Sequence, residues 1–300
     1  MLDYKSIEAL HAVIELQSFE AAAKKLYITQ SAVSQRIKNL EVYYGETVLI
    51  RIQPYKPTEL GKSLIGHFKR VCLLEDTFEQ QMKFRTTKLR IAIALNRDSL
   101  ETWFLDVVDK IDLCQDILLE IMADDQDLTL DYFKKGLVSA CLSTSGKEIA
   151  GSNVTFLGKM EYLLVASPKF IRSYFPTLDG TKNQIKYLLD APALKFDKND
   201  FLHEHYLEKF FGLHKPELNF QVIPSVRGFK QYALLGYGYG LIPKIDIVQE
   251  LKANKLVQLY DDKILEIPIF WHSWTVTSKV YQKFNADVIR HAKHYLNLKN

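Results

Sequence analysis

Apolar and polar positions in the first forty-odd residues repeat with the period of helices. Residues 4–17 carry apolar side chains at helical spacing, and residues 19–26 are rich in strong helix formers behind Ser18, which is suited to be an N-cap. A third amphipathic run covers residues 28–41, after a connection at 27–29 that has the length of a helix-turn-helix turn. We therefore predict a helix-turn-helix unit here.

A β-like run at residues 47–52 follows and gives way to Pro54 and Pro57, which interrupt regular structure. Such an excursion with a basic tip is typical of a wing. Thr58 can cap a helix that reaches about residue 84, on the order of 40 Å of helix. Its apolar stripe steps by close to 3.6 residues: Leu60, Leu64, Phe68, Val71, Leu74, Phe78 and Met82. The stripe can pack on its own domain or pair with a second copy; we favour a dimerising linker helix.

From residue 88 onward, short apolar strands alternate with helices, the pattern of a parallel doubly wound sheet. The predicted strands are 89–95, 117–122, 138–143, 162–167, 191–196, 218–223, 240–243 and 267–272. The predicted helices are 100–111, 128–134, 168–174, 201–211, 228–235 and 278–298. Two α/β units whose last segment returns to the first form a two-lobed clamp. We expect domains at 1–57, 58–86 and 87–300, with lobe I at 87–161 and 267–300 and lobe II at 162–266.

Composition supports an ordinary globular chain of 300 residues, with 47% hydrophobic and 25% charged residues. No leader and no apolar run long enough to span a bilayer is present, so we expect a cytoplasmic protein without membrane contact. Cys72, Cys114 and Cys141 lack disulfide or zinc spacing. Two of them could form a redox pair, but we favour buried structural thiols. Net charge is +3, and residues 21–62 alone hold seven Lys/Arg against three Glu. This basic segment favours a polyanionic partner.

The third helix has two contrasting faces. Val33, Ile37 and Leu40 share one face, whereas hydroxyls, amides and cations occupy the other, near the helix N-terminus. Glutamine can pair with adenine, and Ser, Lys and Arg can contact base edges or phosphates. An amphipathic surface helix would also have a polar face, but the turn, wing and long helix favour a DNA reader. The expected DNA-binding residues are Thr29, Gln30, Ser31, Ser34, Gln35, Arg36, Lys38, Arg51 and Lys56.

A family resemblance rests on FEAAAKKLYITQSAVSQRIKNLE, on GETVLIR and on PTELG. These segments resemble the winged helix-turn-helix and linker helix of LysR-type transcriptional regulators. GYGYGLIP resembles a Gly-rich turn late in the effector domain of that family. The resemblance implies a linker-helix homodimer, often paired into a homotetramer, which binds an operator with paired half-sites on double-stranded DNA. It also implies a two-lobed effector domain like a periplasmic binding protein.

Within that family, ITQSAVSQRIKNLE, ALNRDSLETWFL, ADDQ, ALKFD and FWH resemble the lysine- and arginine-responsive ArgP/LysG branch. That branch controls basic amino-acid export. One segment departs from the branch pattern: SVRGF at residues 225–229 has Arg227 and Gly228 where an acidic residue is expected.

In an open α/β clamp, ligands bind beyond the carboxyl ends of the strands. Ser99 is expected to cap the helix after the first strand and to offer free N–H groups to a carboxylate. Carboxylates after neighbouring strands would hold the cationic groups of lysine or arginine. The expected effector-binding residues are Asn96, Asp98, Ser99, Thr102, Trp103, Asp124, Asp125, Ser143 and Asp197. Read without the resemblance, several of them are ordinary helix-start or loop residues.

Other chemistry finds little support. His203 and His205 would point about 200° apart on a helix, which disfavours a shared metal. Gly236, Gly238 and Gly240 lack the remainder of a dinucleotide fingerprint, and no hydrolase or metalloprotease motif is present. We therefore expect no enzyme, no catalytic residue, no metal and no cofactor.

The resulting expectation is a cytoplasmic, nucleoid-associated, sequence-specific transcription regulator that senses a small amino acid, lysine or arginine. It would control genes of basic amino-acid export or metabolism. One alternative is an architectural or replication-inhibiting DNA-binding protein without an effector. A metabolic enzyme with an appended DNA-binding domain is a further alternative, for which the sequence offers no catalytic constellation.

Overall fold

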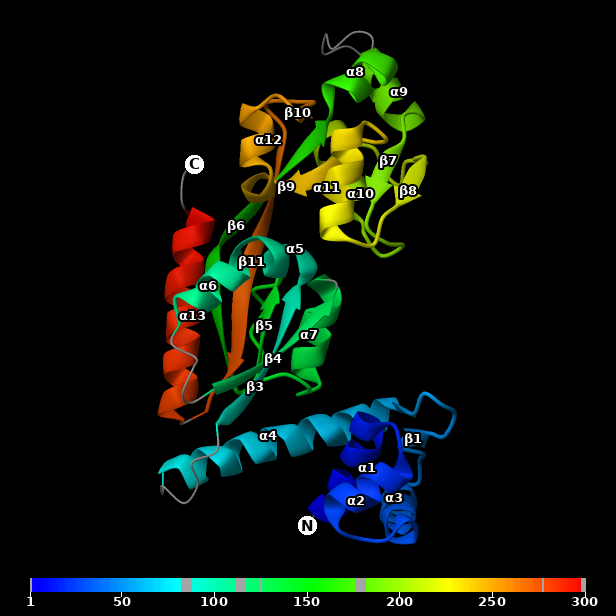
Figure 1. Cartoon of the computed structure of the whole chain (residues 1–300), viewed down its shortest axis with the longest axis vertical. Coiled ribbons are helices and arrows are strands. Elements are labelled where there is room, and N and C mark those ends of the chain that lie inside the picture. The colour runs from blue at the N-terminus through cyan, green and yellow to red at the C-terminus, as the bar shows by residue number, and fades with distance from the viewer. Residues whose placement is uncertain are drawn as a thin grey trace.

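The computed structural model describes residues 2–81, 88–111, 117–124, 126–175, 182–276 and 278–297. Figure 1 shows a helical head at the bottom, an α/β lobe in the middle, which we call lobe I, and a second α/β lobe at the top, lobe II. A long helix runs beneath lobe I and joins it to the head. The expected fold class, a winged helix-turn-helix followed by a long helix and a two-lobed α/β domain, is confirmed.

The head contains three helices: α1 (Tyr4–Leu16), α2 (Phe19–Leu26) and α3 (Gln30–Tyr44). Each begins behind an N-cap residue whose side chain accepts a hydrogen bond from a backbone N–H of the first turn; these caps are Asp3, Ser18 and Thr29 respectively. Tyr27 ends α2 in the left-handed region, at φ 54°, and so redirects the chain into α3. The apolar faces of the helices meet in one core, so the predicted helix-turn-helix is confirmed.

The wing is smaller than the predicted strand at 47–52. Its strands β1 (Leu49–Ile50) and β2 (Lys56–Pro57) are antiparallel, with Leu49 opposite Pro57. Pro57 has no N–H with which to extend the ladder, which is one reason that the pairing stays short. Gln17 donates from Nε2 to the carbonyl oxygen of Tyr55 at 2.9 Å and thereby ties the wing to α1.

The long helix α4 (Glu59–Gln81) begins where expected, because Thr58 Oγ1 accepts from the N–H of Gly61 at 3.1 Å. The two halves of its apolar stripe have different surroundings. Leu64 packs in the core of the head, whereas Leu74 and Phe78 are 52% and 56% exposed. Met82 lies outside the described residues. The first half of the stripe therefore packs on its own domain, and the second half leaves an apolar surface.

A seven-stranded sheet forms lobe I and continues into lobe II, in the order β10-β6-β11-β5-β3-β4 with β9 also paired to β6. In lobe I, β3 (Leu89–Asn96) lies parallel to β4 (Ile117–Asp124) and to β5 (Ala140–Ser143). The helices of this lobe are α5 (Arg97–Ser99), a π-helical turn η1 (Leu100–Phe104), α6 (Leu105–Asp109), α7 (Gln126–Lys134) and α13 (Lys279–Asn297).

The predicted parallel sheet holds for β3, β4 and β5, but not for the two longest strands. The long strands β6 (Ser152–Ala166) and β11 (Ile264–Trp274) are antiparallel to each other over most of their lengths. The chain leaves lobe I through β6 and returns through β11, so the two strands must run in opposite directions. The predicted lobe boundaries at 161/162 and 266/267 fall inside these continuous strands. They remain a prediction, as do the other domain boundaries.

Lobe II holds a second, two-stranded sheet of β7 (Ala193–Lys195) and parallel β8 (Phe220–Val222). Its further elements are α8 (Pro168–Tyr174), α9 (Lys182–Asp190), α10 (Leu202–Phe211), α11 (Val226–Leu235), β9 (Gly240–Pro243), a 3-10 turn η2 (Lys244–Asp246), α12 (Val248–Lys252) and β10 (Val257–Gln258). The hydrophobic pattern of the sequence did not predict α9, α12 and β10. Gly236 ends α11 at φ +80°, in the left-handed region that glycine adopts without a steric penalty.

Candidate functional site

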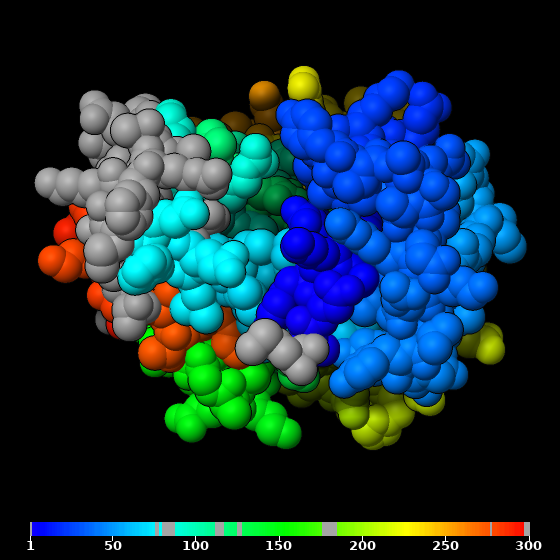
Figure 2. Space-filling model, turned by 90° about the horizontal axis from the view of Figure 1, so that it is seen from below, coloured from blue at the N-terminus to red at the C-terminus, as the bar shows by residue number. Residues whose placement is uncertain are grey.

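The polar face of α3 is available to a partner. Ser31, Gln35 and Lys38 are exposed, and Val33 and Ile37 are fully buried on the opposite face. Figure 2, seen from below, shows the blue head beside the cyan turns of α4 on one side of the molecule. Of the other residues expected on this surface, Thr29 and Gln30 are exposed, and Ser34 and Arg36 are half-buried.

Local hydrogen bonds hold this face in place without covering it. Gln35 Nε2 donates to Asn39 Oδ1 at 2.9 Å, one helical turn away, and the hydroxyls of Thr29 and Ser31 are 2.9 Å apart. Gln35 is therefore oriented along the helix surface, where its amide can exchange Asn39 for a base edge.

The two basic residues expected to contact DNA from the wing differ in how free their charges are. Arg51 Nη2 lies 3.0 Å from Glu41 Oε2, so part of its charge is neutralised within the head. Lys56 is exposed on β2. Lys56 is thus better suited than Arg51 to contact a phosphate.

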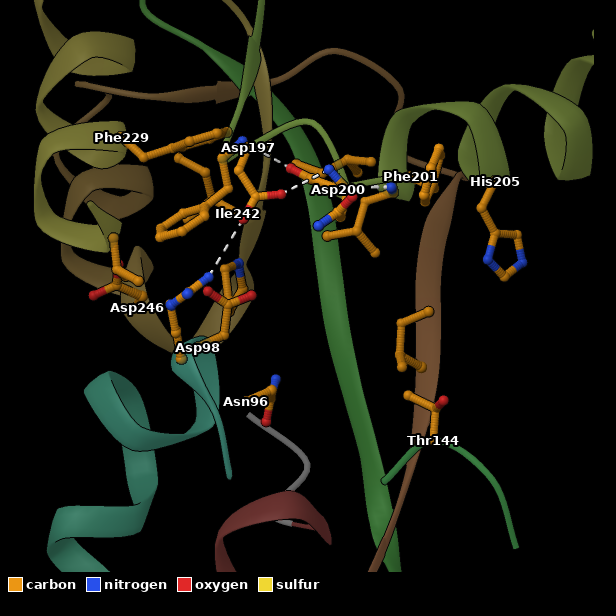
Figure 3. Close-up of a pocket in the computed structure, with 18 of the residues that line it drawn as sticks. Asn96, Asp98, Thr144, Asp197, Asp200, Phe201, His205, Phe229, Ile242 and Asp246 are labelled. Carbon is orange, nitrogen blue, oxygen red and sulfur yellow. Dashed lines mark hydrogen bonds and ion pairs between the residues drawn. The ribbon is translucent and has the colours of Figure 1, made fainter. Parts of the chain in front are cut away.

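A cavity of about 450 Å³ lies between the lobes, at the carboxyl ends of β3, β4 and β7. In Figure 3, Asn96 and Asp98 approach it from lobe I, and Asp197, Asp200 and Phe201 from lobe II. The charged residues that line it are Asp98, Asp124, Asp197, Asp200, Asp246 and Arg97, with His205 beside them. This is the place where open α/β sheets bind ligands. Apolar side chains make up much of its walls, and the charged groups among them are predominantly acidic.

Arg97 connects the two walls. Its Nη2 lies 3.5 Å from Asp124 Oδ1 in lobe I, and its Nη1 lies 3.5 Å from Asp197 Oδ2 in lobe II. The guanidinium carbon is 4.9 Å from the centroid of the Phe196 ring. Asp124 also accepts a 2.5 Å hydrogen bond from the hydroxyl of Tyr132. Burial, together with this carboxylate, raises the pKa of Tyr132 to about 12.

The other carboxylates also have partners. Asp98 Oδ2 accepts from the Tyr162 hydroxyl at 2.6 Å, and Asp246 Oδ1 accepts from Lys230 Nζ at 2.8 Å. Burial raises the pKa of the Asp246 carboxyl, and the Lys230 ammonium opposes the shift. Asp200 accepts the backbone N–H groups of Phe196 and Leu202 at 2.9 and 3.1 Å, so it shapes the loop that carries Asp197.

The expected role of Ser99 as a helix cap is wrong. The helical run begins two residues earlier, at Arg97, and Ser99 lies within it in the right-handed helical region. Ser99 is fully buried, and its Oγ has no hydrogen-bond partner among the described residues. It is not among the residues that line the cavity. Because the helix starts at Arg97, the N-terminal turn with its free N–H groups belongs to residues 97–99.

Several other expected effector residues also lie away from the cavity surface. Trp103 is fully buried in the core of lobe I, with its ring centroid 5.9 Å from that of Phe104, so it forms no wall of the pocket. Thr102 Oγ1 donates back to the carbonyl oxygen of Asp98 at 2.6 Å. Ser143 is buried and accepts from the N–H of Ser145, and Thr144 lines the cavity instead. Asp125 lies outside the described residues.

Four of the expected residues do line the cavity: Asn96, Asp98, Asp124 and Asp197. The sequence pattern did not predict that the cavity is also lined by Arg97, Asp200, His205 and Asp246. Arg97 stands between two residues that were expected there, and Asp246 follows β9. Applying the rule for strand ends to every strand would have pointed to Asp246.

Metal and membrane chemistry find no geometric support in the described part of the chain. No cluster of three or more His, Cys, Asp or Glu side chains there is placed to hold a metal ion. His203 is buried while His205 is exposed, as their expected opposite directions require. No described helix is both long and apolar enough to cross a bilayer. Cys141 is buried and Cys72 half-buried, and Cys114 falls outside the described residues.

Comparison with known proteins gives consistent matches. Residues 4–62 match the family described as "Bacterial regulatory helix-turn-helix protein, lysR family". The "HTH-type transcriptional regulator ArgP" of Vibrio cholerae is 38% identical over 297 residues, which cover 98% of either chain. The ArgP of Pseudomonas fluorescens strain Pf0-1 is 36% identical over 299 residues, 99% of either chain.

Two solved structures extend this similarity to the whole fold. ArgP from Mycobacterium tuberculosis has a TM-score of 0.83 and 32% identity, covering 97% of this chain and 98% of that one. Full-length LysG from Corynebacterium glutamicum, solved with its effector arginine bound, has a TM-score of 0.72 and 28% identity, covering 98% and 99%. The relatives are regulators and not enzymes. The chain belongs to the LysR family of transcriptional regulators, beside the ArgP and LysG proteins.

Proposed function

We propose that this LysR-type regulator is controlled by a basic amino acid, lysine or arginine, that binds between its lobes. The acidic cavity carries this proposal: five aspartates and one arginine line a space of about 450 Å³. A basic amino acid has two cationic groups, so it complements the surplus of carboxylates in this cavity. The related LysG has been solved with arginine as its effector, which supports the same ligand class here.

A thermal-shift panel of the common amino acids tests this proposal. Lysine or arginine should raise the melting temperature, because a ligand that binds only the folded state stabilises it. Asp197→Asn should blunt the shift, since Asp197 lines the cavity, whereas Asp261→Asn, on an exposed turn, should leave it unchanged. If none of the amino acids produces a shift, the effector proposal fails, and the architectural alternative without an effector gains support.

We propose that α3 reads the operator through its exposed polar face, with Gln35 as a base-contacting residue. Gln35→Ala should weaken binding to the native operator by about 1–3 kcal/mol, because a bidentate amide–base contact is lost. Gln249→Ala, an exposed amide on α12, is the matched control and should have no effect. Fluorescence anisotropy with operator and scrambled DNA measures both. An unchanged preference of Gln35→Ala for the operator would refute the base-reading role.

The exposed second half of α4 supports pairing of two copies. Leu74 and Phe78 present apolar side chains that the described residues of one chain leave uncovered. We infer that they pack against the same helix of a partner and place two heads on paired half-sites. Phe78→Ser should raise the dimer dissociation constant in analytical ultracentrifugation, and a variant that stays as tightly assembled as the wild type would contradict this.

Effector binding would change how the protomers sit relative to each other, and so the spacing of the two heads. A regulator that acts in this way works in the cytoplasm, on DNA. We propose that the genes it controls are those of basic amino-acid export or metabolism. Footprinting on such promoters, with and without arginine, tests the targets. Footprints that never respond to the amino acid would argue for regulation without an effector.

A further inference from the structure

Arg97 places a cation of the protein itself inside the effector cavity. Its guanidinium lies between a carboxylate of lobe I and a carboxylate of lobe II, Asp124 and Asp197, at 3.5 Å from each. The Phe196 ring flanks the same group at 4.9 Å. Two acids and an aromatic face are also the surroundings in which a protein would hold the guanidinium or ammonium group of a ligand.

We propose that Arg97 is a specificity-determining residue of the effector site: it occupies the cation subsite between Asp124 and Asp197, and a basic effector must displace it. This inference rests on the proposed function. Arg97 therefore lowers the affinity of the cavity for cationic side chains. Amino acids with a neutral side chain of the same shape are affected much less, because they do not compete for the two carboxylates.

The geometry allows the displacement. Both ion-pair distances exceed the 2.7–2.9 Å that is usual for charge-assisted hydrogen bonds, so Arg97 is loosely held. Its side chain is 36% exposed and has a path toward solvent. A ligand cation that arrives with Arg97 still in place would face a like charge a few ångströms away, which disfavours both charged groups.

All the acids of the cavity have partners within the fold, so position sets the Asp124–Asp197 pair apart: Asp124 accepts the hydroxyl of Tyr132 and Asp197 accepts the N–H of Asn199 at 2.7 Å. Asp98 binds the hydroxyl of Tyr162, and Asp246 binds the ammonium of Lys230. Asp200 accepts two backbone N–H groups of its own loop. In the described part of the chain, Asp124 and Asp197 are the two carboxylates paired with the Arg97 guanidinium, one from each lobe, so they are the pair that the side chain would release on moving.

Isothermal titration of the full-length protein with L-arginine, L-lysine and L-citrulline tests the proposal. Citrulline resembles arginine in shape but has an uncharged side chain. Arg97→Ala and Arg97→Gln should bind arginine and lysine about tenfold more tightly than the wild type, because the like charge is gone. Citrulline affinity should change by less than about twofold. Arg172→Ala, an exposed arginine on α8, is the matched control and should behave as the wild type.

The possible failures are distinguishable. If the wild type binds arginine but both Arg97 variants bind it equally or more weakly, Arg97 does not compete with the ligand cation, and only this inference falls. Weaker binding of all three ligands would assign Arg97 to the α-carboxylate instead. If neither wild type nor variants bind any of the three, the proposed function falls as well. Arg97→Gln retains most of the side-chain length and serves as the test if Arg97→Ala does not fold.

Discussion

Gly66 lies where α4 passes against lobe I, and replacing it with alanine measures how closely the two parts are packed. A Cβ atom on Gly66 would overlap the carbonyl oxygen of Lys135 and lie 2.7 Å from its carbonyl carbon. The opposing Gly136 is also closely packed, since its own added Cβ would be 2.8 Å from the Gly66 carbonyl oxygen. These are backbone atoms, so the methyl group fits only if the helix and the loop move apart.

Overpacking a close contact costs about 1–3 kcal/mol in the packed state. The higher helix propensity of alanine, about 1 kcal/mol, stabilises α4 in the packed and the separated state alike and does not offset this cost. We therefore expect Gly66→Ala to shift the equilibrium between packed and separated α4 by about 1–3 kcal/mol toward separation, at least about a fivefold change in population. The ion pair of Lys135 with Glu59, 2.8 Å apart, would be lost in the separated state.

Hydrogen exchange followed by mass spectrometry is the suitable assay, with peptides from α4 and from the loop after α7. Exchange at both should increase in Gly66→Ala. Ser63→Ala, at an exposed position one turn earlier on α4, is the control and should leave exchange nearly unchanged. If Gly66→Ala instead raises the melting temperature and slows exchange, the helix and the loop are not in close contact in solution, and the reasoning is refuted.

Three further predictions concern stability. Ile37→Ala should destabilise the head by about 2–5 kcal/mol, because it empties a fully buried position in the head core, and urea unfolding monitored on this variant will check it. Burial lowers the pKa of His203 to about 4, below its ordinary value of 6.5, so the unfolded chain binds the proton first as the solution is acidified. Wild-type stability should therefore fall between about pH 6.5 and pH 4, by up to about 3 kcal/mol from this group, and His203→Phe should flatten that part of the curve; an unchanged slope would contradict the neutral buried state. Gly236→Ala should cost more than Gly212→Ala in thermal melts, since both have positive φ but only Gly236 would also place a Cβ 2.9 Å from a hydroxyl, that of Ser167.

Much of the head could be predicted from the chain because its determinants are local. Ser18, Thr29 and Thr58 each cap a helix within three residues of themselves, and the apolar spacing of α3 alone separates its buried face from its exposed polar face. Capping and helical periodicity depend on neighbours in sequence, so no knowledge of the rest of the fold is needed.

The long helix shows where local pattern stops being sufficient. Its apolar stripe predicted α4, but the stripe could not tell which residues meet the head and which stay exposed. The contact of Gly66 with Gly136 joins elements seventy positions apart, and no rule of residue spacing predicts it.

The residues of the effector cavity also fall into two groups, those that the sequence predicted and those that only the tertiary structure placed. Sequence by itself determined that strands alternate with helices, and the rule for strand ends then placed Asn96, Asp98, Asp124 and Asp197 at one crevice, where the structure has them. Only the tertiary structure decided that the helix after β3 starts at Arg97, which buries Ser99 and leaves Arg97 in the cavity. The physical reason is distance along the chain: Arg97 meets Asp197 one hundred residues away because β6 and β11 carry the chain into lobe II and back, and that pairing depends on the whole sheet.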